Sequence, residues 1–327
     1  MAEHILIVGD IGGTNARFAL ADPAGTGFVN ERTLQCADFN SAEVAIQHYL
    51  DETGTAKPNV ICLAVAGPVV NNSVRMPNNP WHISVASLQQ TFTAEEVTLL
   101  NDFEAIAHSL PAVNRTDVAC LGHVAERDLD CPDFTVCVLG PGTGLGAAAL
   151  VSRRGVADAL VTEAGHVGFA PESDLQAEVL NVLRRRYDRV SDERLVSGMG
   201  VENVHWALGQ IAGEPEVPTG AAGIFDAARE DSSSACGQAV ALFFELLGQV
   251  AGNLVLSTGA FDGVYIAGGV AQRHGDLLQA SRFREGFENK GRHRELMTSV
   301  PSHLILHAQP GLLGASRKAR ILDGAIA

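Results

Sequence analysis

Short apolar runs alternate with polar, glycine-containing turns through the first third of the chain. Four runs have the length and the Val, Ile and Leu content that β-strands favour, and they cover residues 4–10, 16–22, 28–35 and 60–69. Apolar residues over 41–52 recur at helical spacing, which predicts an amphipathic helix between the third and fourth strands. A helix, a strand and a helix are then predicted over 85–92, 96–102 and 103–110. Pro111 marks the first predicted boundary.

The second half of the chain begins with the same pattern. An apolar strand, a turn of glycine and threonine and a second apolar strand occupy 134–152, as they do 4–22. This recurrence suggests two related halves. Beyond it, helices are predicted over 172–190, 238–257 and 311–322, and a strand is predicted in 263–270.

Composition and charge narrow the class of protein. The 327 residues are 46% apolar and 19% charged, so the chain can bury cores for two domains. The net charge of −15 argues against nucleic acid and anionic membranes as partners, since both bind through surplus Lys and Arg. The apolar stretch 238–257 is long enough for a membrane span, but Glu245, Gln249 and Asn253 form one polar stripe, which favours a buried helix. We expect two abutting lobes with a small-molecule cleft between them.

The cysteines and the basic runs add no further chemistry. Six cysteines contain no CxxC pair, and several stand in apolar surroundings, so we interpret them as small buried residues in a reducing compartment. The N-terminus has no signal-peptide pattern, which predicts a cytoplasmic protein. The basic runs in 184–186 and 281–296 are interpreted as solvated surfaces.

The two glycine-containing turns, 9–14 and 140–146, are candidate phosphate loops. Successive backbone N–H groups in such a turn can bind phosphate, and Asp10 in the first turn can hold hydrated Mg²⁺. Neither turn alone excludes an ordinary hairpin. The Walker A pattern is absent, and the first turn leads into a strand rather than the helix of a dinucleotide-binding fold. Two such turns facing one cleft would form a phosphate clamp, so the pair is more informative than either member.

Four polar side chains are candidates for substrate binding. Asn101 and Asp102 stand where a predicted strand meets a helix, so Asp102 is either an ordinary N-cap or a general base that projects into the cleft. Glu163 and His166 have the spacing of a helical metal-ligand pair, but their surroundings favour a strand end or a loop. There they could bind sugar hydroxyls.

Two further stretches have ordinary explanations beside the functional ones. Glu193 fits the first turn of a helix capped by Ser191. Gly268 and Gly269 end a predicted strand, where a flat ring could approach the backbone or the chain could simply turn.

Six motifs resemble the bacterial glucokinase family in order and spacing, over nearly the whole chain. They are VGDIGGTNARFAL, LLNDFEAIA, GPGTGLG, EAGHVGF, SDERLVSG and YIAGGV. The resemblance implies an α/β, two-lobed hexokinase/actin/Hsp70-like ATPase fold (ribonuclease H-like) with a central interdomain cleft. It implies transfer of the γ-phosphoryl of Mg-ATP to the 6-hydroxyl of glucose, the entry to glycolysis, by a cytoplasmic homodimer. We divide the chain into a small α/β domain, 1–111 plus 301–327, and a large α/β domain, 112–300.

The resemblance also assigns roles by position, with Asp102 as the base that faces the 6-hydroxyl. Glucose would be bound by Asn101, Asp102, Glu163, His166 and Glu193. The nucleotide would be bound by Gly9, Asp10, Ile11, Gly12, Gly13, Thr14, Gly140, Gly142, Thr143, Gly144, Gly268 and Gly269, with Asp10 holding Mg²⁺ through water. The chain departs from the family at Ala164 and in 76–84, a stretch of the sugar-side wall.

Several alternatives stay open. A non-enzymatic ATP switch, like actin, has paired phosphate loops but lacks a polar sugar pocket beside a base. A kinase for mannose, fructose or glucosamine, or one that uses ADP or polyphosphate, would share the same motifs. The broader repressor/kinase sugar-kinase family is disfavoured, because its zinc-binding cysteines follow the sugar-binding His and no cysteine lies between 137 and 236 here.

Overall fold

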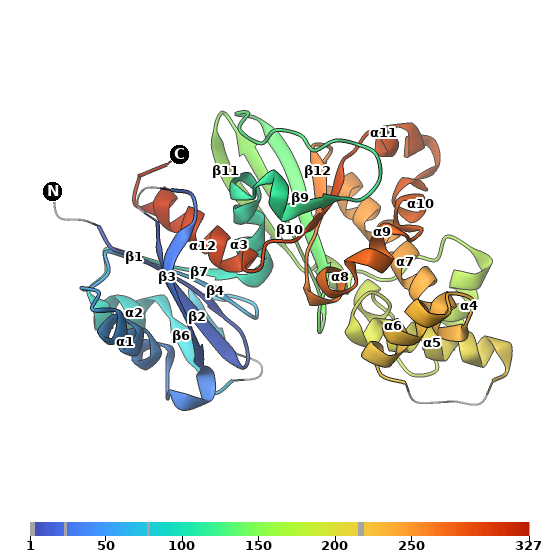
Figure 1. Cartoon of the computed structure of the whole chain (residues 1–327), viewed down its shortest axis with the longest axis horizontal. Coiled ribbons are helices and arrows are strands. Elements are labelled where there is room, and N and C mark those ends of the chain that lie inside the picture. Colours follow the sequence, from blue (N-terminus) through green and yellow to red (C-terminus); the bar gives the residue numbers. More distant parts are fainter. Residues whose placement is uncertain (1–3, 23–24, 77–78, 215–218, 327) are drawn as a thin grey trace.

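Two β-sheets, each flanked by helices, organise the chain (Figure 1). The computed structural model describes residues 4–22, 25–76, 79–214 and 219–326. The first sheet has the order β3 (Phe28–Gln35), β2 (Asn15–Ala21), β1 (Leu6–Ile11), β4 (Val60–Val65) and β7 (Glu96–Asn101). Its first three strands are antiparallel, whereas β1, β4 and β7 run parallel. A small hairpin follows β4 and consists of β5 (Ser73–Arg75) and β6 (His82–Ser84).

The second sheet repeats this arrangement and adds one strand. Its order is β11 (Val156–Thr162), β10 (Leu145–Arg153), β9 (Phe134–Pro141), β12 (Gly263–Ile266), β13 (Ser302–Ile305) and β8 (Val118–Cys120). Again three antiparallel strands, here β11, β10 and β9, are followed by two strands, β12 and β13, that run parallel to the third. The recurrence of the glycine turn therefore does reflect two topologically matching halves.

Helices cover both faces of the first sheet, because its central strands are buried on both sides. Ile7 and Ile61 pack against α1 (Ala42–Thr53) and α2 (Val85–Phe92), whereas Val8 and Ala64 face α12 (Pro310–Leu322). The C-terminal helix thus returns to the N-terminal sheet.

Helix α3 (Asp102–Ser109) lies between the two units and contacts both. Ala105 packs with α12 on the first sheet, whereas Phe103 and Ala107 pack against the second sheet. Since α3 follows directly from β7, the residues at its start are placed where the two units meet.

The remaining helices belong to the second unit. They are α4 (Asp174–Leu183), α5 (Gly198–Ala212), α6 (Ala221–Glu230), α7 (Ala235–Thr258), α8 (Gly269–Arg273), α9 (Gly275–Gln279), α10 (Phe283–Glu288) and α11 (Arg294–Thr298). Short 3₁₀ turns lie at Cys36–Asp38, Leu110–Ala112, Arg115–Asp117, Ala164–His166, Asp192–Arg194 and Gly291–His293.

Helix α7 is the segment that has the length of a membrane span. Among the described residues it is the single helix long and apolar enough to cross a membrane, with 78% of its most apolar window buried inside the structure. Gln249, from the predicted polar stripe, is buried and donates to the carbonyl of Ala170 at 2.7 Å. The expectation of a buried core helix is confirmed, although Gln249 is satisfied within the protein and not by solvent.

Several predicted elements end earlier than expected. The helix predicted over 172–190 ends at Leu183, and beyond its end the Tyr187 hydroxyl donates to the side chain of Asn203 in α5. The strand predicted in 263–270 ends at Ile266, and α8 begins at Gly269.

The interpretation of all cysteines as buried is wrong for two of them: all six are free, but Cys120 and Cys131 are exposed.

The proposed division into domains remains a proposal, and one strand pairing bears on its second boundary. Strand β13 pairs with β12 and β8 of the second sheet. We therefore favour a return to the small domain after Ile305, and not at residue 301.

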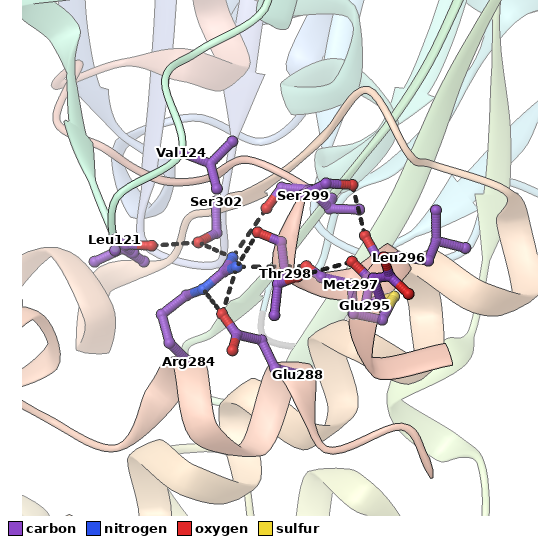
Figure 2. Close-up of polar contacts among 12 residues, drawn as sticks. Leu121, Val124, Arg284, Glu288, Glu295, Leu296, Met297, Thr298, Ser299 and Ser302 are labelled. Atoms are coloured by element: carbon purple, nitrogen blue, oxygen red, sulfur yellow. Dashed lines mark hydrogen bonds and ion pairs between the residues drawn. The ribbon is translucent and has the colours of Figure 1, made fainter. Parts of the chain in front are cut away.

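Arg284 is the centre of a polar network that joins α10, α11 and β13 (Figure 2). Its guanidinium group donates to a carboxylate, a hydroxyl and three carbonyl oxygens, on Glu288, Ser302, Met297, Thr298 and Val300. Ser302 in turn donates to the carbonyl of Leu121. The side chain of Arg284 is only 16% exposed, so the interpretation of 281–296 as a uniformly solvated surface is wrong here.

Replacing Arg284 with Met is expected to lower the free energy of unfolding by about 3 kcal/mol, because Glu288 and the carbonyl acceptors would stay buried without their donor. Urea denaturation followed by circular dichroism measures the change. Arg282→Met is the matched control: Arg282 is 59% exposed, and its ion pairs should contribute less than about 1 kcal/mol. Equal losses in the two variants would show that the network in Figure 2 adds nothing beyond a surface ion pair.

Candidate active site

A cavity of about 880 Å³ opens between the two sheets. Its wall contains residues from both glycine turns, from the start of α3 and from the start of α12. Twelve of the predicted site residues line it: Asp10, Gly13, Asn101, Asp102, Gly140, Gly142, Thr143, Gly144, Glu163, His166, Glu193 and Gly268. Residues from six separate stretches of sequence are thus gathered at one place.

Asn101 and Asp102 lie at the junction of β7 and α3, as predicted. Asn101 is the N-cap residue, and its side chain and that of Glu104 form a capping box. Asp102 is the first residue of the helix and not its cap. The N-cap role that was the alternative for Asp102 therefore belongs to Asn101. Both side-chain oxygens accept from the backbone N–H of Phe103, at 3.0 Å from Asn101 and 2.9 Å from Asp102.

The Asp102 carboxylate combines access to the cavity with partial removal from water. Burial raises the pKa of Asp102, the backbone N–H of Phe103 opposes this shift, and the charge of Glu163 adds to it. A carboxyl whose pKa is raised is a better proton acceptor when ionised, which suits a general base.

Glu163, His166 and Glu193 form a polar wall on the second unit. His166 lies between the two carboxylates, with Nε2 3.9 Å from Glu163 and Nδ1 3.8 Å from Glu193. These separations exceed hydrogen-bond length, so the groups remain available to a ligand. Glu193 is anchored differently, because its Oε2 accepts from the N–H of Leu145 at 2.9 Å. It stands in a 3₁₀ turn that the side chain of Ser191 does not cap, contrary to the helix-capping explanation.

The first glycine turn contributes fewer residues to the cavity than predicted. Gly9 and Ile11 are buried in β1, and a methyl group on Gly9 would lie 2.7 Å from Leu63. Packing of the sheet therefore accounts for Gly9. Neither these two residues nor Gly12, Thr14 and Gly269 line the cavity, and their assignment to the nucleotide stays a prediction.

Asp10 is the acidic group of this turn, and its side chain is 27% exposed. Its environment raises the pKa of the Asp10 carboxyl to about 6: burial is the main cause, Arg17 opposes it and Asp102 adds to it. The Arg17 guanidinium lies 3.7 Å away. The N-terminus of α12 is close on the other side, since a methyl group on Gly311 would lie 3.4 Å from the Asp10 carboxyl carbon.

The second glycine turn packs closely against its neighbours. A methyl group on Gly140 would lie 2.4 Å from the carbonyl oxygen of Ala267, and one on Gly268 would lie 2.5 Å from that of Pro141. Gly268 also has a φ of 85°, which glycine adopts without strain. These close approaches bring the strand end at Gly268 beside the turn, with backbone exposed to the cavity.

The arrangement suits a hydrated magnesium ion and a polyphosphate. No group of three or more His, Cys, Asp or Glu side chains that could enclose a metal occurs in the described part of the chain. Mg²⁺ usually needs only one or two carboxylates, because it keeps several waters and binds substrate phosphates. Asp10, facing the cavity between two glycine turns, fits that role.

The sequence did not indicate several residues that line the cavity. These are Arg17, Ala66, Gly67, Pro68, Phe103, Ile106, Ala147, Thr162, Ala308, Gln309, Pro310 and Gly311. Arg17 carried the clearest signal, because it is a cation opposite Asp10 across the first hairpin, and directly opposed residues lie on the same face of a sheet. The start of α12 gave no such signal in the sequence, because it reaches the cavity only through the return of the C-terminal chain to the first sheet.

Comparisons with known proteins agree in one description. The family model described as Glucokinase matches residues 7–321. The glucokinase of Caulobacter sp. (strain K31) is 40% identical over 315 residues, which cover 95% of this chain and 93% of that protein. The crystal structure of a glucokinase from an Antarctic psychrotroph superposes with a TM-score of 0.89 at 34% identity, covering 98% of this chain and 99% of that one.

A more distant structure shares the fold. It is a glucokinase of the ROK family from Streptomyces griseus, in complex with glucose and AMPPNP. It superposes with a TM-score of 0.62 at 18% identity, covering 97% of this chain and 99% of that one. The two-lobed α/β architecture expected from the motifs is therefore confirmed.

Proposed function

This chain belongs to the glucokinase family, and we propose that the γ-phosphoryl group of Mg-ATP is transferred to the 6-hydroxyl of glucose in its cavity. The product would be glucose 6-phosphate, at the entry to glycolysis. The chain is an ATP-dependent hexose kinase. One observation carries the assignment of roles: the Asp102 carboxylate and the polar wall of Glu163, His166 and Glu193 line the same cavity as both glycine turns.

The proposed mechanism relies on positioning. Asn101, Glu163, His166 and Glu193 would hold the sugar hydroxyls, so that the 6-hydroxyl lies beside Asp102. Asp102 would accept the proton of that hydroxyl as the bond to phosphorus forms, which is worth roughly 10²–10⁴ in rate. Phosphoryl transfer needs little covalent chemistry from the protein, so orientation and charge stabilisation supply the rest.

The phosphates would lie against the two glycine turns. Residues of the second glycine turn and the cationic Arg17 line that part of the cavity. Asp10 would hold Mg²⁺ through water, and the ion would neutralise charge on the phosphate oxygens. Gly268 would border the adenosine.

ATP consumption with and without glucose tests the function directly. We expect ADP formation that depends on glucose, with glucose 6-phosphate as the product. Slow hydrolysis that ignores sugar would instead indicate an ATP switch. The same assay with mannose, fructose and glucosamine, and with ADP or polyphosphate as donor, defines the specificity for both substrates.

Glu163→Gln is expected to raise KM for glucose about tenfold, because a charged acceptor of a sugar hydroxyl contributes about 1.5–3 kcal/mol. The value of kcat should change less, since Glu163 is not placed at the transferred group. Steady-state kinetics over a glucose series measures both. Glu178→Gln, the same change at an exposed position of α4, is the control. An unchanged KM in Glu163→Gln would remove this residue from the glucose site.

We further propose, from the resemblance to the glucokinase family, that the protein acts in the cytoplasm as a homodimer. Light scattering after size exclusion is expected to give twice the chain mass of 34.4 kDa. A mass of one chain at working concentration would contradict the dimer.

A further inference from the structure

Phe103 links the proposed base to the second glycine turn. It follows Asp102 directly, and its N–H is the shared donor to the side chains of Asn101 and Asp102. Its ring is 8% exposed and packs with the apolar cluster on the face of the second sheet. Both Phe103 and Gly146 line the cavity. The residue therefore contacts the proposed acid–base group at one end and the sheet at the other.

The ring of Phe103 lies directly on Gly146 of β10. A methyl group on Gly146 would lie 2.0 Å from Cδ2 and 2.1 Å from Cε2 of the ring, far inside van der Waals contact. Only glycine therefore allows the ring this position. Gly146 pairs across the hairpin with Gly140, whose own lack of a side chain allows close contact with Ala267. A continuous row of tight contacts thus runs from the base to the turn and on towards Gly268.

We propose that Phe103, packed on Gly146, is a positioning residue that fixes the place of the Asp102 carboxylate relative to the second glycine turn. This inference rests on the proposed role of Asp102 as the base. Base and phosphate loop come from different units of the fold, and α3 contacts both sheets. The Phe103–Gly146 contact joins the units at the reacting end of α3, where a displacement of about 1 Å costs about a hundredfold in rate.

A double-mutant cycle tests this contact. Gly146→Ala should lower kcat about a hundredfold, measured at saturating glucose and ATP, because the methyl group displaces the ring. Glucose affinity, measured by calorimetry, should change less than about threefold. Phe103→Ala should lower kcat about tenfold to a hundredfold, and adding Gly146→Ala to it should cause no further loss, since the atoms that clash are gone. Independent, multiplicative losses would overturn the proposal.

A second arm asks whether the effect acts through Asp102. In an Asp102→Asn background, Gly146→Ala should leave the residual rate unchanged. A further large loss there would show general damage to the site and would overturn the positioning role. Full activity of Asp102→Asn would instead refute the base assignment itself, so the two failures are distinguishable.

Matched controls separate positioning from packing. Phe134→Ala removes another buried ring of the same apolar cluster, at the far end of β9. It should destabilise the protein about as much as Phe103→Ala while keeping kcat. Gly209→Ala places a methyl group on α5 where no atom lies within 4 Å. If Gly146→Ala does not fold, the comparison of Phe103→Ala with Phe134→Ala decides: equal kcat values overturn the proposal.

Discussion

Asp102→Asn is expected to lower kcat at least about a hundredfold while glucose still binds. The amide keeps the size of the carboxylate, and its oxygen can still accept from the N–H of Phe103, so the start of α3 should stay intact. What is lost is the ability to take the proton from the 6-hydroxyl. Steady-state kinetics gives kcat, and calorimetry with glucose alone gives the binding constant.

Asp174→Asn is the control for this change. Asp174 is the first residue of α4, the same helix position that Asp102 has in α3, but it is exposed and is not among the residues that line the cavity. Loss of an acidic group near a helix N-terminus costs about 0.3–1 kcal/mol of stability and should not affect kcat. Near-normal turnover of Asp102→Asn would show that another group accepts the proton.

Much of the site could be predicted because the sequence encodes strands and turns locally. Buried strands end at Ile11, directly after Asp10, in the turn at 140–146 and at Asn101, and the ends of neighbouring parallel strands lie at one edge of a sheet. Once two matching halves were recognised, these ends were expected to face one another. The cavity lining agrees with that expectation for most of the predicted residues.

The misses share a physical cause, which is that they depend on contacts distant in sequence. Gly146 looked like part of a phosphate loop, yet its tight contact is with the Phe103 ring. Arg284 looked like a surface cation in a charged run, but the carbonyl groups at the end of α11 surround it. Strand β13 has only four residues, so its own pattern could not show which sheet it joins. Tertiary packing decides each of these cases.

Asp10→Asn is expected to lower kcat/KM for Mg-ATP about a hundredfold, because the proposed magnesium position would lose its one protein carboxylate. The pH profile gives a second readout. With the pKa of Asp10 raised to about 6, the carboxylate is largely protonated at pH 5, so kcat/KM for Mg-ATP should fall as the pH drops through about 6. In Asp10→Asn this contribution to the acid limb should disappear. Asp38→Asn, an exposed change in the same unit, should keep it.

The same substitution should make the ligand-free protein more stable, and the sign follows from the pKa. The ordinary pKa of 3.8 describes the unfolded chain, whereas the folded chain holds the Asp10 proton up to about pH 6. Between these values the folded state binds more protons, so stability falls as pH rises and the loss persists above pH 6. Asp10→Asn should therefore raise the free energy of unfolding by about 3 kcal/mol at pH 7.5 and leave it nearly unchanged near pH 3.5. Urea denaturation at both pH values measures this difference. A variant that lost stability at pH 7.5 would show that burial of the Asp10 carboxylate does not destabilise the folded protein, which would contradict a raised pKa for this group.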